Sequence, residues 1–378
     1  MKKFLVKLAA AVVIIFTAVF LLSPYHIDEK SMPQPESVIT DKYPEAVVYR
    51  QQTETINGNR QVIHMLEVNL HNPKVKISPV LSHDSIFGFE KTSSMAQRKN
   101  AYAAVNGGFF YPYGQPSGFF IIDGELLCSP VSMTGIPVFA INQDRKVIME
   151  NIGLRIFLKM ENNSLMIDGI NREPDKNEII AFTPEYGLST RLRGRTVFNV
   201  ITEKGVITES GLYDDEVEIS RQGIIIAATG ERTEELRSLL NKKGSKVELS
   251  YKVTPDLGSI VQAMEGGFWV VKDGEKVVKE KEPWVGLMTN REPRTVVGVK
   301  NDHTAVFMTV DGRQPGHSIG LTGHELAEYL LSKGIYNALM LDGGASTTMV
   351  VDGKIINRPS YRGQERRIGG AVVIEVDK

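Results

Sequence analysis

Met340-Leu-Asp342-Gly-Gly-Ala-Ser346 is one of three similar stretches in this chain, and together they indicate its fold. In each, a short apolar run ends in a polar residue followed by Gly-Gly, and an Asp-Gly pair comes some residues later. The polar residues are Asn106, Glu265 and Asp342, and the Asp-Gly pairs begin at Asp123, Asp273 and Asp352. Asp-Gly favours tight hairpins, whereas Gly-Gly lets a ligand approach the backbone. Any one stretch is as often an ordinary turn, but three predict a shared site.

The rest of the chain predicts an α+β fold in which strands dominate. β-rich runs alternate with turn residues at 62–70, 118–122, 247–253 and 305–310. Three segments read as helices, at 92–99, 233–243 and 322–333, the last with the capping box Thr322-x-x-Glu325. We therefore expect a strand-dominated, mixed-sheet domain with a few short helices.

The N-terminus is typical of an exported protein. Lysines at positions 2, 3 and 7 precede an apolar or small-residue run from Leu8 to Leu22, and this charge order places the following chain outside the cytoplasm. We predict a signal peptide or signal anchor at 1–22, an extended proline-containing linker at 23–45, and a folded domain at 46–378. The protein is then membrane-anchored through this segment or secreted.

Composition narrows the class of function. A net charge of -1 gives no global field for nucleic acid. The single cysteine, Cys128, excludes an intramolecular disulfide and is expected to be a buried apolar residue. The chain lacks a phosphate-binding loop, a dinucleotide fingerprint, a His-Glu-x-x-His motif and a Gly-x-Ser-x-Gly elbow. We expect no cofactor, and no pattern supports a metal site.

Polar residues that could do chemistry are concentrated in the last third of the chain. Asp342 is the strongest candidate, because an apolar run from Asn337 to Leu341 precedes it and glycines and hydroxyl residues follow it. Arginine offers a phosphate a planar fork of donors. Most single arginines are surface or ion-paired residues, but three of those in this region could each bind a phosphate in this way: Arg294, Arg313 and Arg366.

Several of these motifs, taken in order, resemble the phosphodiester glycosidase family, over about residues 60 to 375. The stretches are Ala104-Val-Asn-Gly-Gly-Phe-Phe110, Pro293-Arg-Thr-Val-Val-Gly298, Val310-Asp-Gly-Arg313, the helix 322–333 with Leu341 to Val350, Asn357-Arg-Pro359 and Glu365-Arg-Arg-Ile-Gly-Gly-Ala371. Ala345 stands where a third glycine is expected. The resemblance implies hydrolysis of the bond between a sugar's anomeric carbon and phosphate, here in a cell-envelope glycan or exopolysaccharide.

The resemblance and the chemistry together assign roles to these residues. One carboxylate must activate water or attack the anomeric carbon; we predict Asp342 for this, with Glu265 or Asp311 as the second carboxylate. Arginines neutralise the departing phosphate. We predict that Arg294 and Arg313 hold the phosphate and that Asn106, Ser346 and Thr347 bind sugar hydroxyls or orient the carboxylate. Thr295 and Arg366 complete the predicted substrate-binding residues.

Two other functions fit the same sequence. The site could belong to an ordinary glycosidase acting on wall or capsule polysaccharide, which would not need to recognise a phosphate. Alternatively, the chain could be a non-catalytic glycan-binding protein on the outer face of the membrane. Its sugar platform would then use exposed aromatic residues, namely Tyr111, Tyr113, Trp269 and Trp284.

Overall fold

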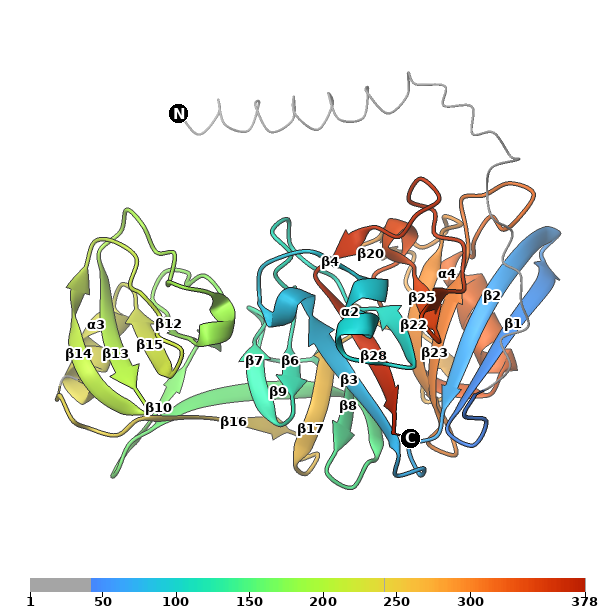
Figure 1. Ribbon diagram of the computed structural model, residues 1–378. Coiled ribbons are helices and arrows are strands. Elements are labelled where there is room, and N and C mark those ends of the chain that lie inside the picture. Colours follow the sequence, from blue (N-terminus) through green and yellow to red (C-terminus); the bar gives the residue numbers. More distant parts are fainter. Residues whose placement is uncertain (1–41, 241, 378) are drawn as a thin grey trace, which may run out of the picture. The chain divides into compact units, whose positions relative to one another are not determined.

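Strands from four larger sheets carry the fold of residues 42–240 and 242–377, the part of the chain that the computed structural model describes (Figure 1). The first sheet has the order β1-β2-β23-β22-β24-β18-β19. The bounds of its strands are β1 (Val47–Ile56), β2 (Asn59–Val68), β23 (Ala305–Val310), β22 (Arg294–Lys300), β24 (Ile335–Met340), β18 (Trp269–Lys272) and β19 (Glu275–Lys276).

The second sheet has the order β10-β9-β8-β17-β6-β7, and β16 also pairs with β9. Its strands are β10 (Ser164–Ile167), β9 (Val147–Lys159), β8 (Ile136–Asn142), β17 (Ile260–Glu265), β6 (Phe120–Ile122), β7 (Glu125–Cys128) and β16 (Glu248–Thr254). The third sheet has the order β26-β25-β5-β28-β3, with β26 (Lys354–Ile355), β25 (Met349–Val351), β5 (Ala103–Asn106), β28 (Gly370–Val376) and β3 (Val75–Leu81).

The fourth sheet has the order β11-β12-β15-β13-β14. Its strands are β11 (Gly169–Ile170), β12 (Ile179–Phe182), β15 (Gly223–Ala228), β13 (Val197–Glu203) and β14 (Val206–Tyr213). Two short pairs complete the set, β20 (Lys281–Glu282) with β21 (Gly286–Leu287) and β27 (Arg367–Ile368) with β4 (Glu90–Lys91). Among the described strands only β11 and β12 pair in parallel, so the predicted mixed sheet applies to the fourth sheet alone.

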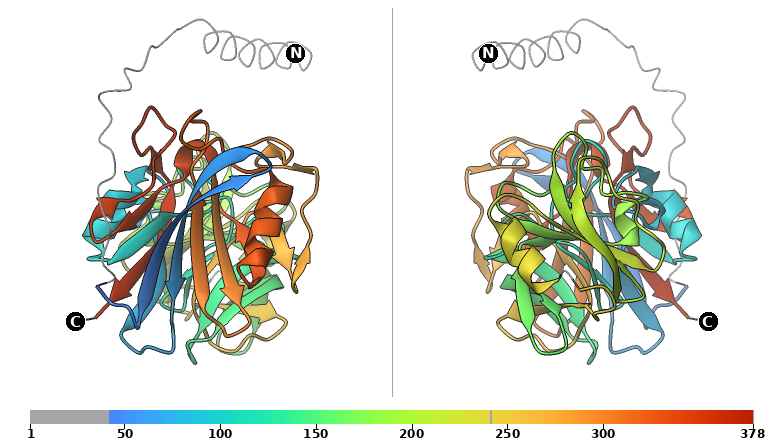
Figure 2. Two further views of the ribbon diagram at one scale, coloured as in Figure 1. Left: turned by 90° about the vertical axis from the view of Figure 1, so that its right-hand side faces the viewer. Right: turned by 90° about the vertical axis from the view of Figure 1, so that its left-hand side faces the viewer.

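Helices are few, as predicted, and each covers one face of a sheet. They are α2 (Thr92–Arg98), α3 (Arg232–Leu239) and α4 (Gly323–Ser332), with single 3-10 turns η2 (Ser82–Asp84), η3 (Pro184–Tyr186) and η4 (Gly344–Ser346). Helix α4 begins at the predicted capping box, in which Thr322 and Glu325 each accept a hydrogen bond from the other's backbone. Its apolar side packs against the first sheet (Figure 2).

The predicted helix at 233–243 is wrong at its C-terminal end. Helix α3 ends at Leu239. Leu240 already has non-helical backbone angles and is buried. Beyond the undescribed residue 241, the amide of Gly244 donates to Ile207 O, which leads the chain toward the sheet strands. Gly244 therefore occupies a turn with positive φ rather than the end of the helix.

The Asp-Gly pairs form the hairpin turns that the sequence predicts. They join β6 to β7, β18 to β19 and β25 to β26, and both residues of each pair have positive φ. This geometry matches the right-handed twist of the strands that it connects. The strand predicted before Asp342 is also confirmed, because β24 ends at Met340 and its last residues are fully buried.

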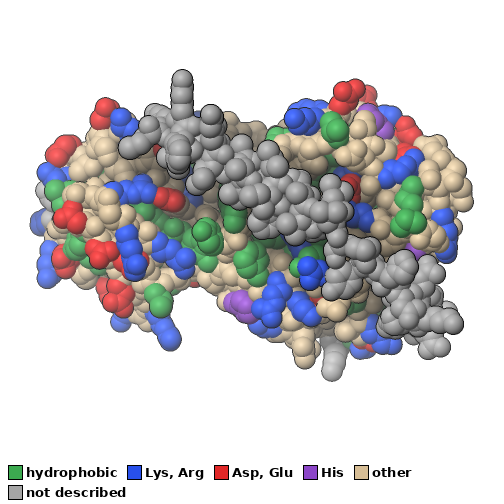
Figure 3. All heavy atoms as spheres, turned by 90° about the horizontal axis from the view of Figure 1, so that it is seen from above, with side chains coloured by type: hydrophobic (Ala, Val, Ile, Leu, Met, Phe, Trp, Pro, Cys, Tyr) green, Lys and Arg blue, Asp and Glu red, His purple; other side chains and the backbone are tan. Residues whose placement is uncertain are grey.

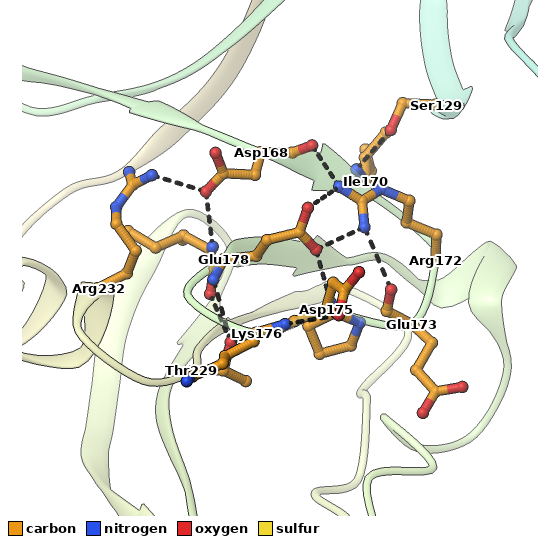
Figure 4. Close-up of polar contacts among 12 residues, drawn as sticks. Ser129, Asp168, Ile170, Arg172, Glu173, Asp175, Lys176, Glu178, Thr229 and Arg232 are labelled. Carbon is orange, nitrogen blue, oxygen red and sulfur yellow. Dashed lines mark hydrogen bonds and ion pairs between the residues drawn. The ribbon is translucent and has the colours of Figure 1, made fainter. Parts of the chain in front are cut away.

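The fourth sheet carries a cluster of charged side chains that pair with one another. Arg172 makes two hydrogen bonds of 2.7 Å to the Glu178 carboxylate. Asp168 accepts 2.8 Å hydrogen bonds from Arg232 and from the amide of Ile179 (Figure 4). The Arg172 guanidinium holds the pKa of Glu178 below its ordinary value despite the opposing effect of burial. These contacts give the cluster a structural role.

The predictions for the N-terminal segment and most of the linker fall outside the described residues. The domain boundary at residue 46 therefore stays a prediction, although β1 begins at Val47. Within residues 42–240 and 242–377, no helix is long and apolar enough to cross a membrane. Cys128 is buried, as expected, at 2% exposure.

Candidate active site

The three Gly-Gly turns meet, although each follows a strand of a different sheet. Asn106 ends β5 of the third sheet, Glu265 ends β17 of the second, and Asp342 follows β24 of the first. The amide of Asp342 donates to Gly107 O at 3.1 Å, and that of Gly267 donates to Met340 O at 2.8 Å.

The glycines make this approach possible. A methyl group on Gly108 would lie 3.2 Å from Glu265 O, so the first and second turns are in contact. The second and third turns are linked by the Gly267 amide, and a Cβ on Gly266 would lie 2.7 Å from Leu339 Cβ, just before the third turn. The expectation that the three turns lie together is confirmed, and the polar residues Asn106, Glu265 and Asp342 are borne on adjoining backbone.

Asp342 is a partly buried carboxylate with two polar side-chain partners. Ser346, in η4, donates a hydrogen bond to Oδ2. Arg366 Nη2 lies 3.3 Å from the same oxygen. Burial raises the pKa of Asp342 above its ordinary value of 3.8, and the Ser346 hydrogen bond and the Arg366 charge offset only part of that effect. Such a carboxylate is more basic than a solvated aspartate.

A buried hydrogen-bond network holds the backbone of the Asp342 turn. Asn106 Nδ2 donates to Asp342 O at 2.5 Å, and Asn106 Oδ1 accepts from Thr295 Oγ1 at 2.8 Å. The Thr295 and Thr347 hydroxyls lie 3.3 Å apart. Asn106, Thr295 and Thr347 are each at most 1% exposed. In this structure they hold the backbone of the turn. That Asn106 and Thr347 bind sugar hydroxyls or orient the carboxylate stays a prediction.

Glu265 is the second carboxyl group at the three turns. Its Oε2 accepts a hydrogen bond of 3.2 Å from the amide of Phe119, and its side chain lies over Gly118, where a Cβ would lie only 2.3 Å from Oε2. Burial raises the pKa of Glu265 from 4.5 to about 7, against the smaller lowering effect of the Phe119 amide. A carboxyl group with this pKa holds a proton that it can give up near neutral pH.

Asp311, the other predicted second carboxylate, is enclosed by donors and only 1% exposed. His317 Nε2 lies 2.8 Å from Oδ2 and His64 Nε2 lies 3.6 Å from it. Oδ1 accepts from Asn357 Nδ2 at 3.2 Å and from the amide of Arg358 at 3.0 Å. Although burial opposes it, the two histidines hold the pKa of Asp311 below its ordinary value. These contacts favour Glu265 over Asp311 as the second carboxylate.

The three predicted arginines occupy different surroundings. Arg294 is 3% exposed and donates to Leu321 O and Asn290 O; burial lowers its pKa to about 10. Arg313 is half exposed, and its guanidinium lies over Gly344, where a Cβ would be 3.1 Å from Nη2. Arg313 and Arg366 therefore reach the Asp342 turn, whereas the Arg294 guanidinium donates to two loop carbonyls.

Sequence reasoning missed several neighbours of these residues. Phe110 lies under the Arg366 guanidinium, with its ring centre 5.1 Å from Cζ. Glu292 pairs with Arg313. The Phe-Phe pair after the first Gly-Gly was a usable signal, whereas nothing in the spacing links His64 or Glu292 to its partner. Basic and acidic side chains are interspersed on the face seen in Figure 3, so recognition of an anion depends on individual arginines.

Metal ligands do not gather in this part of the protein. The described residues contain no group of three or more histidine, cysteine, aspartate or glutamate side chains arranged to hold a metal ion. The buried His64 and the partly buried His317 instead face the Asp311 carboxylate.

A comparison with protein families finds a match to the phosphodiester glycosidase model over residues 186–375, half of the chain. The chain belongs to this family. Among curated proteins, the mouse N-acetylglucosamine-1-phosphodiester alpha-N-acetylglucosaminidase is 25% identical over 187 residues, which are 46% of this chain and 32% of that enzyme. The chain spans no more than about a third of the length of the curated relatives it matches.

Solved structures support the fold. A hypothetical protein from Synechocystis has a TM-score of 0.75 and 19% identity, over 88% of this chain and 62% of its own. A putative exported protein from Burkholderia pseudomallei has a TM-score of 0.67 and 20% identity, over 84% of this chain and 74% of its own. At these sequence identities the comparison supports a shared fold but gives no information about activity.

Proposed function

We propose that this protein hydrolyses the bond between the anomeric carbon of a sugar and phosphate in a glycosyl-1-phosphodiester. The observation that carries the proposal is the meeting of the Asp342 and Glu265 turns, with two arginines at the first. Most glycosidases use a pair of carboxyl groups for catalysis. The arginines can neutralise and hydrogen-bond a phosphate leaving group.

Asp342 and Glu265 divide the work in this proposal. Asp342 acts on the reaction centre, either by taking a proton from water or by attacking the anomeric carbon itself. The bond from that carbon to the phosphate oxygen then breaks, and its electron pair stays on the oxygen. Glu265 supplies a proton to this oxygen, since its pKa of about 7 keeps a large fraction protonated near neutral pH. In the first case the water oxygen bonds to the anomeric carbon directly; in the second, water then hydrolyses the ester formed on Asp342 and frees the carboxylate. The products are a free sugar and a phosphate monoester.

Arg313 and Arg366 hold the phosphate in this scheme. Arg366 already contacts Asp342, and its buried Nε has no hydrogen-bond partner among the described residues. An unpaired buried donor costs free energy unless a ligand or water satisfies it. A phosphate oxygen would satisfy it and spread its charge over the guanidinium. Arg294 is buried and holds the carbonyls of Leu321 and Asn290 rather than touching the anion.

The substrate belongs to the cell envelope in this proposal. The lysine-led apolar run at residues 2–22 is an export signal by composition, and one structural relative is described as a putative exported protein. The accessible glycans for such a protein are envelope or extracellular polysaccharides. The membrane is a partner through the N-terminal segment.

The test is hydrolysis of an N-acetylglucosamine-1-phosphodiester by the purified protein, followed by separate assays of free sugar and phosphate monoester. Equal release of both products supports the proposal. A free sugar-1-phosphate should compete with the substrate, because the arginines bind the anion. Hydrolysis of a neutral polysaccharide that sugar-1-phosphate leaves unaffected would assign the site to an ordinary glycosidase. Sugar binding without release of either product would assign the protein to glycan recognition alone.

A further inference from the structure

Two exposed aromatic side chains, Trp284 and Tyr111, gather beside the turns of the candidate site. Trp284 is 44% exposed and lies at the tip of the β20–β21 hairpin. Its ring stacks on Phe109 with centres 5.5 Å apart and an interplanar angle of 17°. Tyr111 is 40% exposed and meets Trp284 edge to face, also at 5.5 Å. Tyr113, two residues further along, is 75% exposed.

Phe109 ties this aromatic cluster to the Glu265 turn. Its ring lies against Gly267, where a Cβ would be only 2.1 Å from Cε2. Phe109 also follows the Asn106-Gly-Gly turn directly. The next residue, Phe110, lies under Arg366 instead. The Phe-Phe pair therefore contacts Arg366 through Phe110, and Trp284 and the Glu265 turn through Phe109.

A tryptophan in this protein need not be exposed to solvent, as the second tryptophan shows. The other tryptophan, Trp269, is partly buried and donates its indole Nε1–H to Asn151 at 2.7 Å. No such side-chain acceptor is found for Trp284 among the described residues. Tryptophan and tyrosine left exposed beside clustered polar groups are typical of recognition sites.

We propose that Trp284 and Tyr111 bind the ring of a second sugar, the one attached through the phosphate on the leaving-group side. The inference rests on the proposed function, in which Glu265 protonates the departing phosphate oxygen and the leaving group therefore lies on its side. A pyranose presents C–H groups on its ring face, which pack on an aromatic ring while its hydroxyls stay in water. Protein interfaces of ordinary size need about 800 Å² on each partner, far more than two half-exposed aromatic side chains supply.

Two phosphodiesters of N-acetylglucosamine distinguish this role. In one the second alcohol is methanol, and in the other it is a hexose. The quantity measured is the ratio of kcat/KM for the hexose diester to that for the methyl diester. Trp284→Ala should lower this ratio about tenfold, as expected for loss of an aromatic hot spot, through KM for the hexose diester. The matched control, Trp269→Phe, should leave the ratio as in the wild type.

Fluorescence gives a second readout that does not depend on turnover. In Trp269→Phe, Trp284 is the only tryptophan, so its emission should change saturably with the hexose diester and more weakly with the methyl diester. Adding Tyr111→Ala should weaken that binding. If the wild type cleaves neither diester, the proposed function fails, and the emission titration alone tests whether Trp284 and Tyr111 bind the sugar ring. An unchanged ratio in Trp284→Ala, or an emission insensitive to the hexose diester, would overturn the inference.

Discussion

Glu265→Gln should make the protein more stable and less active at the same time. The substitution keeps the shape of the side chain and an oxygen that accepts from the Phe119 amide, but it removes the titrating proton. Because burial raises the pKa of Glu265 from 4.5 to about 7, the folded state holds this proton at pH values where the unfolded chain has released it.

The sign and size follow from this difference in pKa. Stability falls with rising pH wherever the folded state binds more protons than the unfolded state. For Glu265 this is the window between about pH 4.5 and 7, beyond which the loss is constant. The difference between 4.5 and about 7, at about 1.4 kcal/mol for each pH unit, corresponds to about 3 kcal/mol. Glutamine carries no such cost, so the variant gains up to about this amount above pH 7.

The assay is the free energy of unfolding of wild type and Glu265→Gln, at pH 4.5 and at pH 8.5, with turnover in parallel. We expect similar stability at pH 4.5, higher stability of the variant at pH 8.5, and a loss of turnover of about 10²-fold or more. Glu125→Gln, on an exposed hairpin residue, controls for the removal of one negative charge. A variant that is equally stable at both pH values and equally active would refute the reasoning.

Two further substitutions test neighbouring parts of the site. Arg313→Lys and Arg366→Lys keep the charge but lose the planar fork. Each should lower kcat/KM for a glycosyl-1-phosphodiester about tenfold or more; wild-type kinetics in both would remove the arginines from phosphate binding. Asp311→Asn should destabilise the protein, since it uncharges a buried carboxylate that two histidines face. The pKa of Asp311 is lowered, so its contribution is present above the unfolded value and lost as pH falls through the folded one. Melting curves against pH should therefore converge in acid, and parallel curves would contradict this role.

Local chemistry explains why much of the fold was predictable. The three Asp-Gly hairpins depend on the backbone freedom of two residues, which the dipeptide itself reveals. The capping box before α4 is a four-residue signal of the same kind. The helix predicted at 233–243 was too long. Its end is set by the burial of Leu240 and by the contact of Gly244 with Ile207 in a neighbouring strand, which local propensity does not reveal.

The candidate site was predictable to the extent that its residues carry repeated local signals. The polar heads Asn106, Glu265 and Asp342 share one pattern, and the structure brings their turns together. The pattern does not reveal which residues are buried. It did not show that Asp311 is enclosed between two histidines or that Arg294 is buried under Leu321. These contacts join segments that are distant in the sequence and share no motif.

The central claim is that Asp342 carries out the chemistry, and Asp342→Asn tests it most directly. Asparagine preserves the shape and can still accept from Ser346, but it loses the charge and the basicity. Turnover of an N-acetylglucosamine-1-phosphodiester should fall by about 10²-fold or more, while the melting temperature stays near that of the wild type. A folded Asp342→Asn variant that turns over the diester at nearly the wild-type rate would contradict the account.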